Sequence, residues 1–380
     1  MYFTKPLSEA KFLSRPNRFV VNILIEGASA GASLPNPGKL GELFFPGVTL
    51  LVYSMEGRKS TYPWRVAAVE TLHGEIVMLD TQVTNRVAEY LITQKRITGL
   101  QGWSLVRREF PLGKSRFDFL LRRGDRHMLL EVKSCTLFHG ETAMFPDAVT
   151  SRGSRHVSEL AEYAQHGYDA AVLFIVHGGY IRRFSPEFHT DPVFAQTLYE
   201  ARMHLRIFAE SIGWDRSLRH IVSQHSLTVD WRGYETHGKD SGIYAVVLEN
   251  REEQSVAIGA MGTRVFQPGF YLYIGSAKNG LTARVARHQR KRKNKHWHID
   301  YLRDATRVVQ TFPIRIRGEN ECFFAQDVSA LADEEIRGFG CSDCSCRSHL
   351  FYFKASPIQN PSFQEILLRY RMEHVFASLS

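Results

Sequence analysis

Short apolar runs separated by turn residues dominate the first part of the chain. Residues 19–25 and 48–53 are rich in Val, Ile, Leu and Phe, and Gly, Pro and Asn interrupt the sequence around them. Runs of this length, bounded by turn residues, are typical of β-strands. Residues 1–82 are therefore predicted to form a small β-barrel or meander.

The pattern then changes to one that mixes helices and strands. Apolar residues with helical spacing follow Thr84 and Asn85, either of which is a suitable N-cap. A Gly124-Asp125 pair between two strand patterns favours a tight hairpin turn. In order, we expect a helix, the two hairpin strands, a second helix and a strand, over residues 85–97, 115–122, 127–133, 154–166 and 170–176. This order predicts an α/β core over residues 83–233.

A polar, Gly-containing segment marks the end of that core. Residues 234–240 are predicted to be a linker, because strand-like patterning resumes directly after them at residues 243–248. Residues 241–355 are predicted to form another domain. A tail over residues 356–380 follows, in which residues 361–380 have the pattern of one helix.

Length and charge narrow the class of protein. A chain of 380 residues exceeds what one core usually organises, and its formal net charge of +9 favours polyanionic partners, with nucleic acid as the first candidate. We expect no membrane partner and a cytoplasmic protein, because the sequence has neither a run of eighteen apolar residues nor a signal-peptide pattern. The oligomeric state is left open.

The hairpin places three residues with complementary chemistry near one another. Side chains alternate along a strand, so Glu131 and Lys133 share one face, and a suitable register adds Asp118 to it. Carboxylate oxygens hold Mg²⁺ or Mn²⁺, which activates water, while a lysine stabilises developing negative charge. We therefore expect a metal at Asp118 and Glu131, with Lys133 as a catalytic group in phosphodiester hydrolysis. Solvated cross-strand pairs on a surface hairpin are the alternative.

Several further marks surround this trio. They are Tyr62-Pro63-Trp64, Asn85-Arg86, Arg116-Phe117-Asp118-Phe119-Leu120, Glu131-Val132-Lys133-Ser134 and Phe145-Pro146-Asp147-Ala148. With them, residues 15–232 closely resemble the sugar fermentation stimulation protein A family. The resemblance implies an OB-like barrel, a core similar to the PD-(D/E)XK nucleases with the trio at the metal-site positions, and DNA binding. One position departs, because Pro35-Asn36-Pro37-Gly38 stands where relatives usually have Pro-Asn-Thr-Gly.

Basic residues open the helix that follows the trio. Arg152, Arg155 and His156 could meet a phosphate together with the free N–H groups of the helix start. Ordinary solvated charge is an equal alternative. Asp147 is either a further carboxylate of the site or a turn residue, because Pro-Asp is common in turns.

A second set of motifs lies in the last third of the chain. Gly242-Ile243-Tyr244 opens one strand pattern and Tyr273-Ile274-Gly275 closes another. Arg284 and His288 lie four residues apart on one helix face, and Glu321 starts another apolar-periodic stretch. Each tyrosine alone is more often a core residue.

With these motifs, residues 241–354 resemble the GIY-YIG nuclease superfamily, and most closely its branch fused to endonuclease III-like repair enzymes. The marks of that branch are His296-Trp297-His298-Ile299-Asp300-Tyr301 and residues 342–351. The resemblance implies that Tyr244 and Tyr273 frame a site, one of them able to act as general base. It also implies that Arg284 stabilises phosphate charge and that Glu321 binds the single metal.

The densest basic run of the chain follows the second tyrosine motif. It contains, among others, Arg287, Arg290, Lys291, Arg292 and Lys293. Phosphate contact with strong salt dependence is the expected use, and a solvated helix end is the alternative.

Three of the five cysteines crowd into six residues. Cys341, Cys344 and Cys346, together with His349, resemble zinc ligands, although structural sites usually use two separated pairs. The alternative is a packed loop that closes the second active site, with His349 or Asp343 contributing to that site. An odd number of cysteines fits a reducing compartment.

These observations predict an α/β multidomain protein composed of an OB-like β-barrel, a PD-(D/E)XK restriction-endonuclease-like core and a GIY-YIG-like α/β domain. The expected function is hydrolysis of phosphodiester bonds with Mg²⁺ or Mn²⁺, and Zn²⁺ is a weaker expectation. DNA is the favoured substrate and RNA the other candidate. The alternative is a non-catalytic DNA-binding regulator of sugar metabolism genes.

Overall fold

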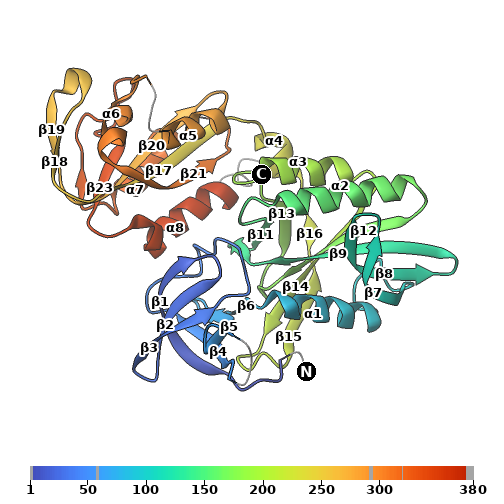
Figure 1. The fold of residues 1–380 in the computed structure, drawn as a ribbon. Coiled ribbons are helices and arrows are strands. Elements are labelled where there is room, and N and C mark those ends of the chain that lie inside the picture. Colours follow the sequence, from blue (N-terminus) through green and yellow to red (C-terminus); the bar gives the residue numbers. More distant parts are fainter. Residues whose placement is uncertain (1–2, 57–59, 291–293, 319, 374–380) are drawn as a thin grey trace. The chain divides into compact units, whose positions relative to one another are not determined.

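The computed structural model describes residues 3–56, 60–290, 294–318 and 320–373. The chain divides into two compact units, Met1–Trp231 and Arg232–Ser380. The first unit contains the predicted barrel and the α/β core, which share buried apolar clusters, and the second contains the remaining domain (Figure 1). Among the described residues, no helix is both long and apolar enough to span a membrane.

The first unit begins with a β-barrel. Its strands are β1 (Ser8–Asn17), β2 (Val20–Ile25), β3 (Ala28–Ser33), β4 (Thr49–Ser54), β5 (Trp64–Glu70) and β6 (Ile76–Met78). They are hydrogen-bonded in the order β3-β2-β1-β4-β5-β6, and a further pairing of β3 with β5 closes the barrel. Phe12, Ile23 and Leu50 are buried inside, so the apolar runs of the sequence line the barrel interior. The predicted OB-like barrel is confirmed.

A six-stranded mixed sheet forms the core of the same unit. In sheet order its strands are β15 (Ile221–Ser226), β14 (Arg206–Trp214), β12 (Asp169–Val176), β9 (Arg126–Cys135), β8 (Ser115–Arg123) and β7 (Ser104–Leu112). Strands β9, β12 and β14 are parallel, and the others pair antiparallel. A smaller sheet contains β10 (Leu137–His139), β11 (Thr142–Phe145), β13 (Arg183–Pro186) and β16 (Thr228–Val229). The predicted α/β core is confirmed.

Helices cover both faces of the six-stranded sheet. They are α1 (Thr81–Thr93), α2 (Ser151–Gln165) and α3 (Pro192–Ala201). Along β12, Leu173 and Ile175 belong to the apolar cluster that contains α1, whereas Val172 and Phe174 belong to the cluster that contains α2 and α3. The two-residue period of a strand explains why β12 is apolar throughout, since both of its faces are buried.

The first two helices begin earlier than their apolar patterns indicate. Helix α1 starts at Thr81, and its N-cap is Asp80, whose side chain accepts a hydrogen bond from the Gln82 amide. The prediction of Thr84 or Asn85 as N-cap is therefore wrong. Helix α2 is capped in the same way by Thr150. Polar first turns hide the starts of both helices from a search for apolar periodicity.

The second unit is built on a five-stranded sheet. In sheet order its strands are β21 (Arg307–Ile314), β17 (Gly242–Asn250), β20 (Gly269–Ala277), β23 (Leu350–Phe353) and β22 (Glu334–Glu335). Its helices are α4 (Arg232–His237), α5 (Leu281–Gln289), α6 (His298–Ala305), α7 (Glu321–Ser329) and α8 (Pro361–Leu368). Between β17 and β20, the strands β18 (Gln254–Ala257) and β19 (Thr263–Phe266) form a separate hairpin. Helix α4 includes part of the segment expected to be a linker.

The end of the chain belongs to the core of the second unit. Helix α8 continues directly into a π-helical turn over Arg369–Glu373, so the described part of the predicted helix is helical throughout, and residues 374–380 lie outside the described part. Phe363 and Tyr370 are buried in the cluster that contains the β17 side chains. Tyr370 also donates a hydrogen bond to Asp327, which anchors the π-helical turn.

Candidate functional sites

The β8–β9 hairpin positions the predicted acidic trio. Regular pairing runs from Arg123 opposite Arg126, around the Gly124-Asp125 turn, to Phe119 opposite Leu130. Directly beyond this pairing, the Asp118 carboxylate Oδ2 accepts a hydrogen bond from the Val132 amide at 2.7 Å. The side chain of Asp118 is thereby fixed beside the Glu131–Lys133 segment of the neighbouring strand.

Both carboxylates are held by further hydrogen bonds. Glu131 Oε1 lies 2.6 Å from Lys133 Nζ and 2.7 Å from Nδ1 of His156 on α2. Asp118 Oδ1 accepts a hydrogen bond from Nδ2 of Asn85 on α1 at 2.8 Å. Glu131 and His156 are almost fully buried. The two helices that flank the sheet therefore fix the orientations of the two acids.

The electrostatics of this site suit a divalent cation. Burial and the nearby Glu131 charge raise the pKa of Asp118 to about 6. Burial also opposes the ionisation of Glu131, but hydrogen bonds from His156 and Lys133 outweigh it and lower the pKa of Glu131. Two carboxylates that repel each other in a partly dehydrated place are stabilised when a cation binds between them. Their oxygens are the ligands that Mg²⁺, Mn²⁺ and Ca²⁺ prefer.

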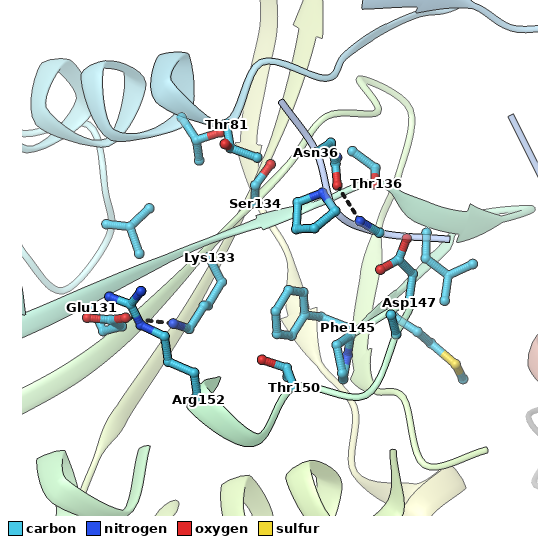
Figure 2. A pocket seen from close by; sticks show the side chains of 18 of the residues that line it. Asn36, Thr81, Glu131, Lys133, Ser134, Thr136, Phe145, Asp147, Thr150 and Arg152 are labelled. Carbon is cyan, nitrogen blue, oxygen red and sulfur yellow. Dashed lines mark hydrogen bonds and ion pairs between the residues drawn. The ribbon is translucent and has the colours of Figure 1, made fainter. Parts of the chain in front are cut away.

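The trio opens into a cavity of about 400 Å³. Arg152 of α2 and Arg18 also line it, as do Asn36 and Gly38 of the barrel. Figure 2 shows Glu131, Lys133 and Arg152 grouped on one side of this cavity and Asn36 and Asp147 on the other. The cavity therefore lies where barrel and core meet, and its lining is both acidic and basic.

The three basic residues predicted at the start of α2 have different surroundings. Arg152 lines the cavity. Arg155 is exposed and lies 3.9 Å from Glu159. His156 is 3% exposed and hydrogen-bonded to Glu131, so it cannot reach a bound phosphate and is instead placed to orient that carboxylate. The apolar periodicity of the sequence could not show that His156 is buried, because helix α2 begins before that periodicity becomes visible.

Asp147 supports the barrel loop that lines the cavity. Its Oδ2 accepts a hydrogen bond from the Leu40 amide at 3.3 Å. A Cβ atom at Gly38 would lie 2.2 Å from the same oxygen, so any larger residue there would displace the Asp147 carboxylate. Arg15 further fixes the loop by donating to the carbonyl oxygens of Asn36 and Gly38. Of the two roles expected for Asp147, these contacts fit a structural one.

The two tyrosine motifs lie on paired strands of the second unit. In the β17–β20 ladder Tyr244 is opposite Gly275 and Tyr273 is opposite Val246, and the two tyrosine rings are 6.3 Å apart. A Cβ atom at Gly275 would lie 2.5 Å from the Tyr244 hydroxyl oxygen, which explains the glycine of the second motif. Both tyrosines line a cavity of about 300 Å³.

The other predicted residues of this site lie around the tyrosines. Arg284 and Glu321 line the same cavity, and the Arg284 guanidinium lies 4.3 Å from the ring centre of Trp297. His288 is buried, with Nε2 3.0 Å from the Tyr244 hydroxyl, and is not part of the cavity lining. His288 is therefore placed to act through Tyr244. The cavity also contains His298 and Asp343, the first of which sequence reasoning did not assign to the site.

Burial controls the ionisation of both tyrosines. It raises the pKa of Tyr244 and of Tyr273, against the opposing charge of Arg284. Near neutral pH both phenols keep their protons. This favours a tyrosine that donates a hydrogen bond over the general base that the resemblance implies.

A cluster of three thiols and one imidazole lies next to Glu321. The ligand atoms of Cys322, Cys344, Cys346 and His349 all lie within 4.8 Å of one another. Cys341, which we expected as a ligand, is not in this group, and Cys322 takes its place. Its only signal in the sequence is that it directly follows Glu321, since the distance of 22 residues to Cys344 suggests no pairing.

The basic run of the second unit is only partly described. Arg287 lies 2.8 Å from Asp300, whose side chain is fully buried, so Arg287 has a structural role. Arg290 is exposed. Lys291, Arg292 and Lys293 lie outside the described residues.

Two family models match the first unit in comparison with known proteins. The family model of the sugar fermentation stimulation protein RE domain matches residues 82–215, and that of the SfsA N-terminal OB domain matches residues 13–79. A sugar fermentation stimulation protein homologue from Shouchella clausii is 35% identical over 227 residues, which cover 59% of this chain and 97% of that protein. The chain belongs to the sugar fermentation stimulation protein family.

Two further similar proteins carry names of the same family. A homologue from Chloroflexus aurantiacus is 41% identical over 199 residues, covering 52% of this chain and 76% of that protein. A structure of Pyrococcus furiosus SfsA in complex with Ca²⁺ is 30% identical, with a TM-score of 0.55, and covers 60% of this chain and 99% of that one. The Sfs homologues thus account for a little over half of the chain.

The second unit contains a different domain. The model of a domain of unknown function, DUF123, matches residues 243–372, and this domain is GIY-YIG-like. Its match reaches beyond helix α8, in agreement with the packing of that helix into the core. This member of the Sfs family therefore carries a second, GIY-YIG-like domain.

Proposed function

We propose that the chain is a divalent-cation-dependent nuclease that hydrolyses phosphodiester bonds of nucleic acid, with DNA as the favoured substrate. One observation carries the proposal: Asp118, Glu131 and Lys133 line a single cavity, and the two acids are held there by Asn85, the Val132 amide and His156. A merely solvated hairpin would not bury its acids or orient them from two helices.

Each residue of the trio has a defined task in this proposal. Asp118 and Glu131 would hold Mg²⁺ or Mn²⁺, which supplies Lewis-acid polarisation and neutralises phosphate charge. Lys133, whose ammonium lies 2.6 Å from Glu131, stabilises negative charge that develops on the phosphate or orients the attacking water. The Ca²⁺ bound to the Pyrococcus furiosus relative supports a site for a hard divalent cation.

Nucleic acid is the partner that fits the surroundings of the trio. Arg152 and Arg18 line the same cavity and can bind the phosphates that flank the scissile bond. The matched OB domain belongs to a fold that commonly binds single strands by stacking and charge. A net charge of +9 increases the rate at which a polyanion associates.

A second nuclease-type site is proposed in the GIY-YIG-like unit. Tyr244, Tyr273 and Arg284 would bind and orient the phosphate, and Glu321 would hold a single cation. Because burial keeps the tyrosines protonated, Tyr244 acts here as a hydrogen-bond donor. His288 orients the Tyr244 hydroxyl through the hydrogen bond between the two side chains. The basic segment that includes Arg290 would add phosphate contacts.

The test uses the full chain with labelled duplex, single-stranded and branched substrates in Mg²⁺ or Mn²⁺. Glu131→Gln and Glu321→Gln are compared with the unaltered protein, separately and together. Cleavage that requires the cation and disappears with Glu131→Gln supports the first site, and cleavage that disappears with Glu321→Gln supports the second. Equal cleavage by the double variant identifies a contaminant, and no cleavage of any substrate contradicts the proposal in favour of a binding protein.

A further inference from the structure

Three thiols and one imidazole converge in the second unit from separate segments. Cys322 is in the first turn of α7, Cys344 and Cys346 are in the loop before β23, and His349 directly precedes β23. All four ligand atoms lie within 4.8 Å of one another. Sulfur and imidazole nitrogen are the ligands that Zn²⁺ prefers, and three cysteines with one histidine is a usual structural set.

The spacing of the ligand atoms agrees with a tetrahedral ion. With zinc–sulfur bonds of about 2.3 Å and zinc–nitrogen bonds of about 2.0 Å, ligand atoms in such a site are roughly 3.5 Å apart. Cys344 Sγ and His349 Nε2 are 3.5 Å apart. The remaining pairs of ligand atoms all lie within 4.8 Å of each other.

The orientation of His349 is a second and independent observation. Its Nε2 faces Cys344, while its Nδ1 lies 2.7 Å from Oε1 of Glu321. The ring is 2% exposed. A metal-bound histidine characteristically donates its other N–H to a carboxylate, which fixes the tautomer and the ring plane. His349 is arranged in this way, with Nε2 available as the ligand.

We infer that Cys322, Cys344, Cys346 and His349 bind one structural zinc ion, and that His349 thereby holds the carboxylate of Glu321 at the edge of the second cavity. Four protein ligands leave no open position, which is the arrangement of structural rather than catalytic zinc. The zinc site does not depend on the proposed nuclease activity. Only the consequence for Glu321 rests on that proposed function.

Cys341 provides a matched control. It lies in the same crowded loop, but its Sγ is 3.6 Å from the Arg347 carbonyl oxygen and it is not among the grouped ligands. A cluster of adjacent cysteines that bound metal loosely would use Cys341 as readily as Cys322. The two cysteines therefore separate the proposed site from nonspecific binding by the loop.

The test measures zinc in the full chain, without any substrate. Protein produced with added zinc and purified under reducing conditions is analysed for metal by mass spectrometry. We expect about one zinc per chain in the unaltered protein and in Cys341→Ser, and at least a tenfold lower content in Cys322→Ser. Full zinc in Cys322→Ser, loss of zinc in Cys341→Ser, or a disulfide among the three grouped cysteines would overturn the assignment.

Cobalt substitution covers the case in which Cys322→Ser fails to fold. The unaltered protein, reconstituted with Co²⁺ in place of zinc, should show the absorption of tetrahedral cobalt together with thiolate charge-transfer bands, and Cys341→Ser should show the same spectrum. A spectrum of octahedral cobalt without charge-transfer bands contradicts the site. Since neither readout involves cleavage, an inactive protein that contains zinc would contradict the proposed function alone.

Discussion

Each unit contains a glutamate held by a buried histidine, yet the two histidines are anchored differently. Nδ1 of His156 lies 2.7 Å from Glu131, and Nδ1 of His349 lies 2.7 Å from Glu321. Nε2 of His156 is 3.4 Å from Nε of Arg152, whereas Nε2 of His349 faces the thiol of Cys344. In the first unit an arginine of the same helix fixes the ring, and in the second a cysteine cluster does.

The surroundings of the two glutamates also differ. Glu131 lies beside Asp118 in a buried place, and burial together with the negative charge of Glu131 raises the pKa of Asp118. Glu321 instead borders a cavity with buried, protonated tyrosines. A site in which two like charges repel each other is stabilised most by a bound cation. Strong cation dependence is therefore expected in the first unit, and dependence on the histidine anchor in the second.

The largest effect should come from removing the charge of one glutamate at a time. Glu131→Gln keeps an oxygen that can accept the hydrogen bonds from Lys133 and His156, so the fold is retained while a cation ligand is weakened. We expect cation-dependent cleavage at the first site to fall on the order of 10³-fold. Initial rates on one labelled substrate measure this, with circular dichroism as the check on folding.

Glu321→Gln is the matched variant for this comparison. It keeps an acceptor for His349 in the second unit and should leave cleavage by the first site unchanged. An equal loss of the same cleavage in both variants would show that the two sites do not act separately.

The next effect is a pH dependence specific to the first unit. A cation needs the ionised form of Asp118, whose pKa is raised to about 6. Cation affinity should therefore be constant above pH 7 and fall about tenfold per pH unit below pH 6. Calorimetric titration with Mn²⁺ at several pH values measures it.

The same pKa shift has a consequence for stability. Because the folded-state pKa of Asp118 is above its value in an unfolded chain, its contribution to stability is present at low pH and is lost as pH rises through about 6. A divalent cation should therefore raise the melting temperature more at pH 7.5 than at pH 5. An equal rise at both pH values, or one retained in Asp118→Asn, would locate the cation elsewhere.

A smaller effect should come from the histidine anchor of the first unit. His156→Phe keeps the ring volume but removes the hydrogen bond to Glu131, so cation affinity should fall about tenfold. His156→Gln, which restores a donor, should recover part of the affinity. His166→Phe alters an exposed histidine of the same segment and should change nothing. If His156→Phe weakens nucleic-acid binding but not cation binding, the histidine does not position the acid.

Local patterns in the sequence determined most of the fold prediction. The hairpin of β8 and β9 was predictable because a Gly-Asp turn joins two alternating runs, and that turn also fixes the register that brings Asp118 near Glu131. The tyrosine strands were instead recognisable from their two Gly- and Tyr-containing motifs, because the β18–β19 hairpin separates β17 from β20 in the sequence. In the first case the chemistry lies on elements adjacent in sequence, and in the second it lies on motifs, one of which places Gly275 against the Tyr244 ring.

Features that depend on distant contacts were not predictable. Cys322 joins cysteines more than twenty residues away because α7 begins beside the loop before β23, and no periodicity records that approach. The role of His156 depends on its burial against Glu131, whereas its sequence neighbours suggested a basic surface. The start of α1 was misplaced because a single side chain, Asp80, caps the helix within a polar segment.

The smallest expected effect concerns the basic run of the second unit. Arg290 is exposed, whereas Arg287 is bonded to the buried Asp300, so the two arginines should behave differently when each is changed to glutamine. Removing one phosphate contact lowers the slope of log affinity against log salt by about 1. We expect this of Arg290→Gln, with the melting temperature unchanged, in a salt titration of duplex binding by fluorescence anisotropy. Arg287→Gln should instead lower the melting temperature, because it removes the ion pair between Arg287 and the buried Asp300 carboxylate. An unaltered salt slope in Arg290→Gln would mean that Arg290 makes no phosphate contact, because each lost contact must lower the slope.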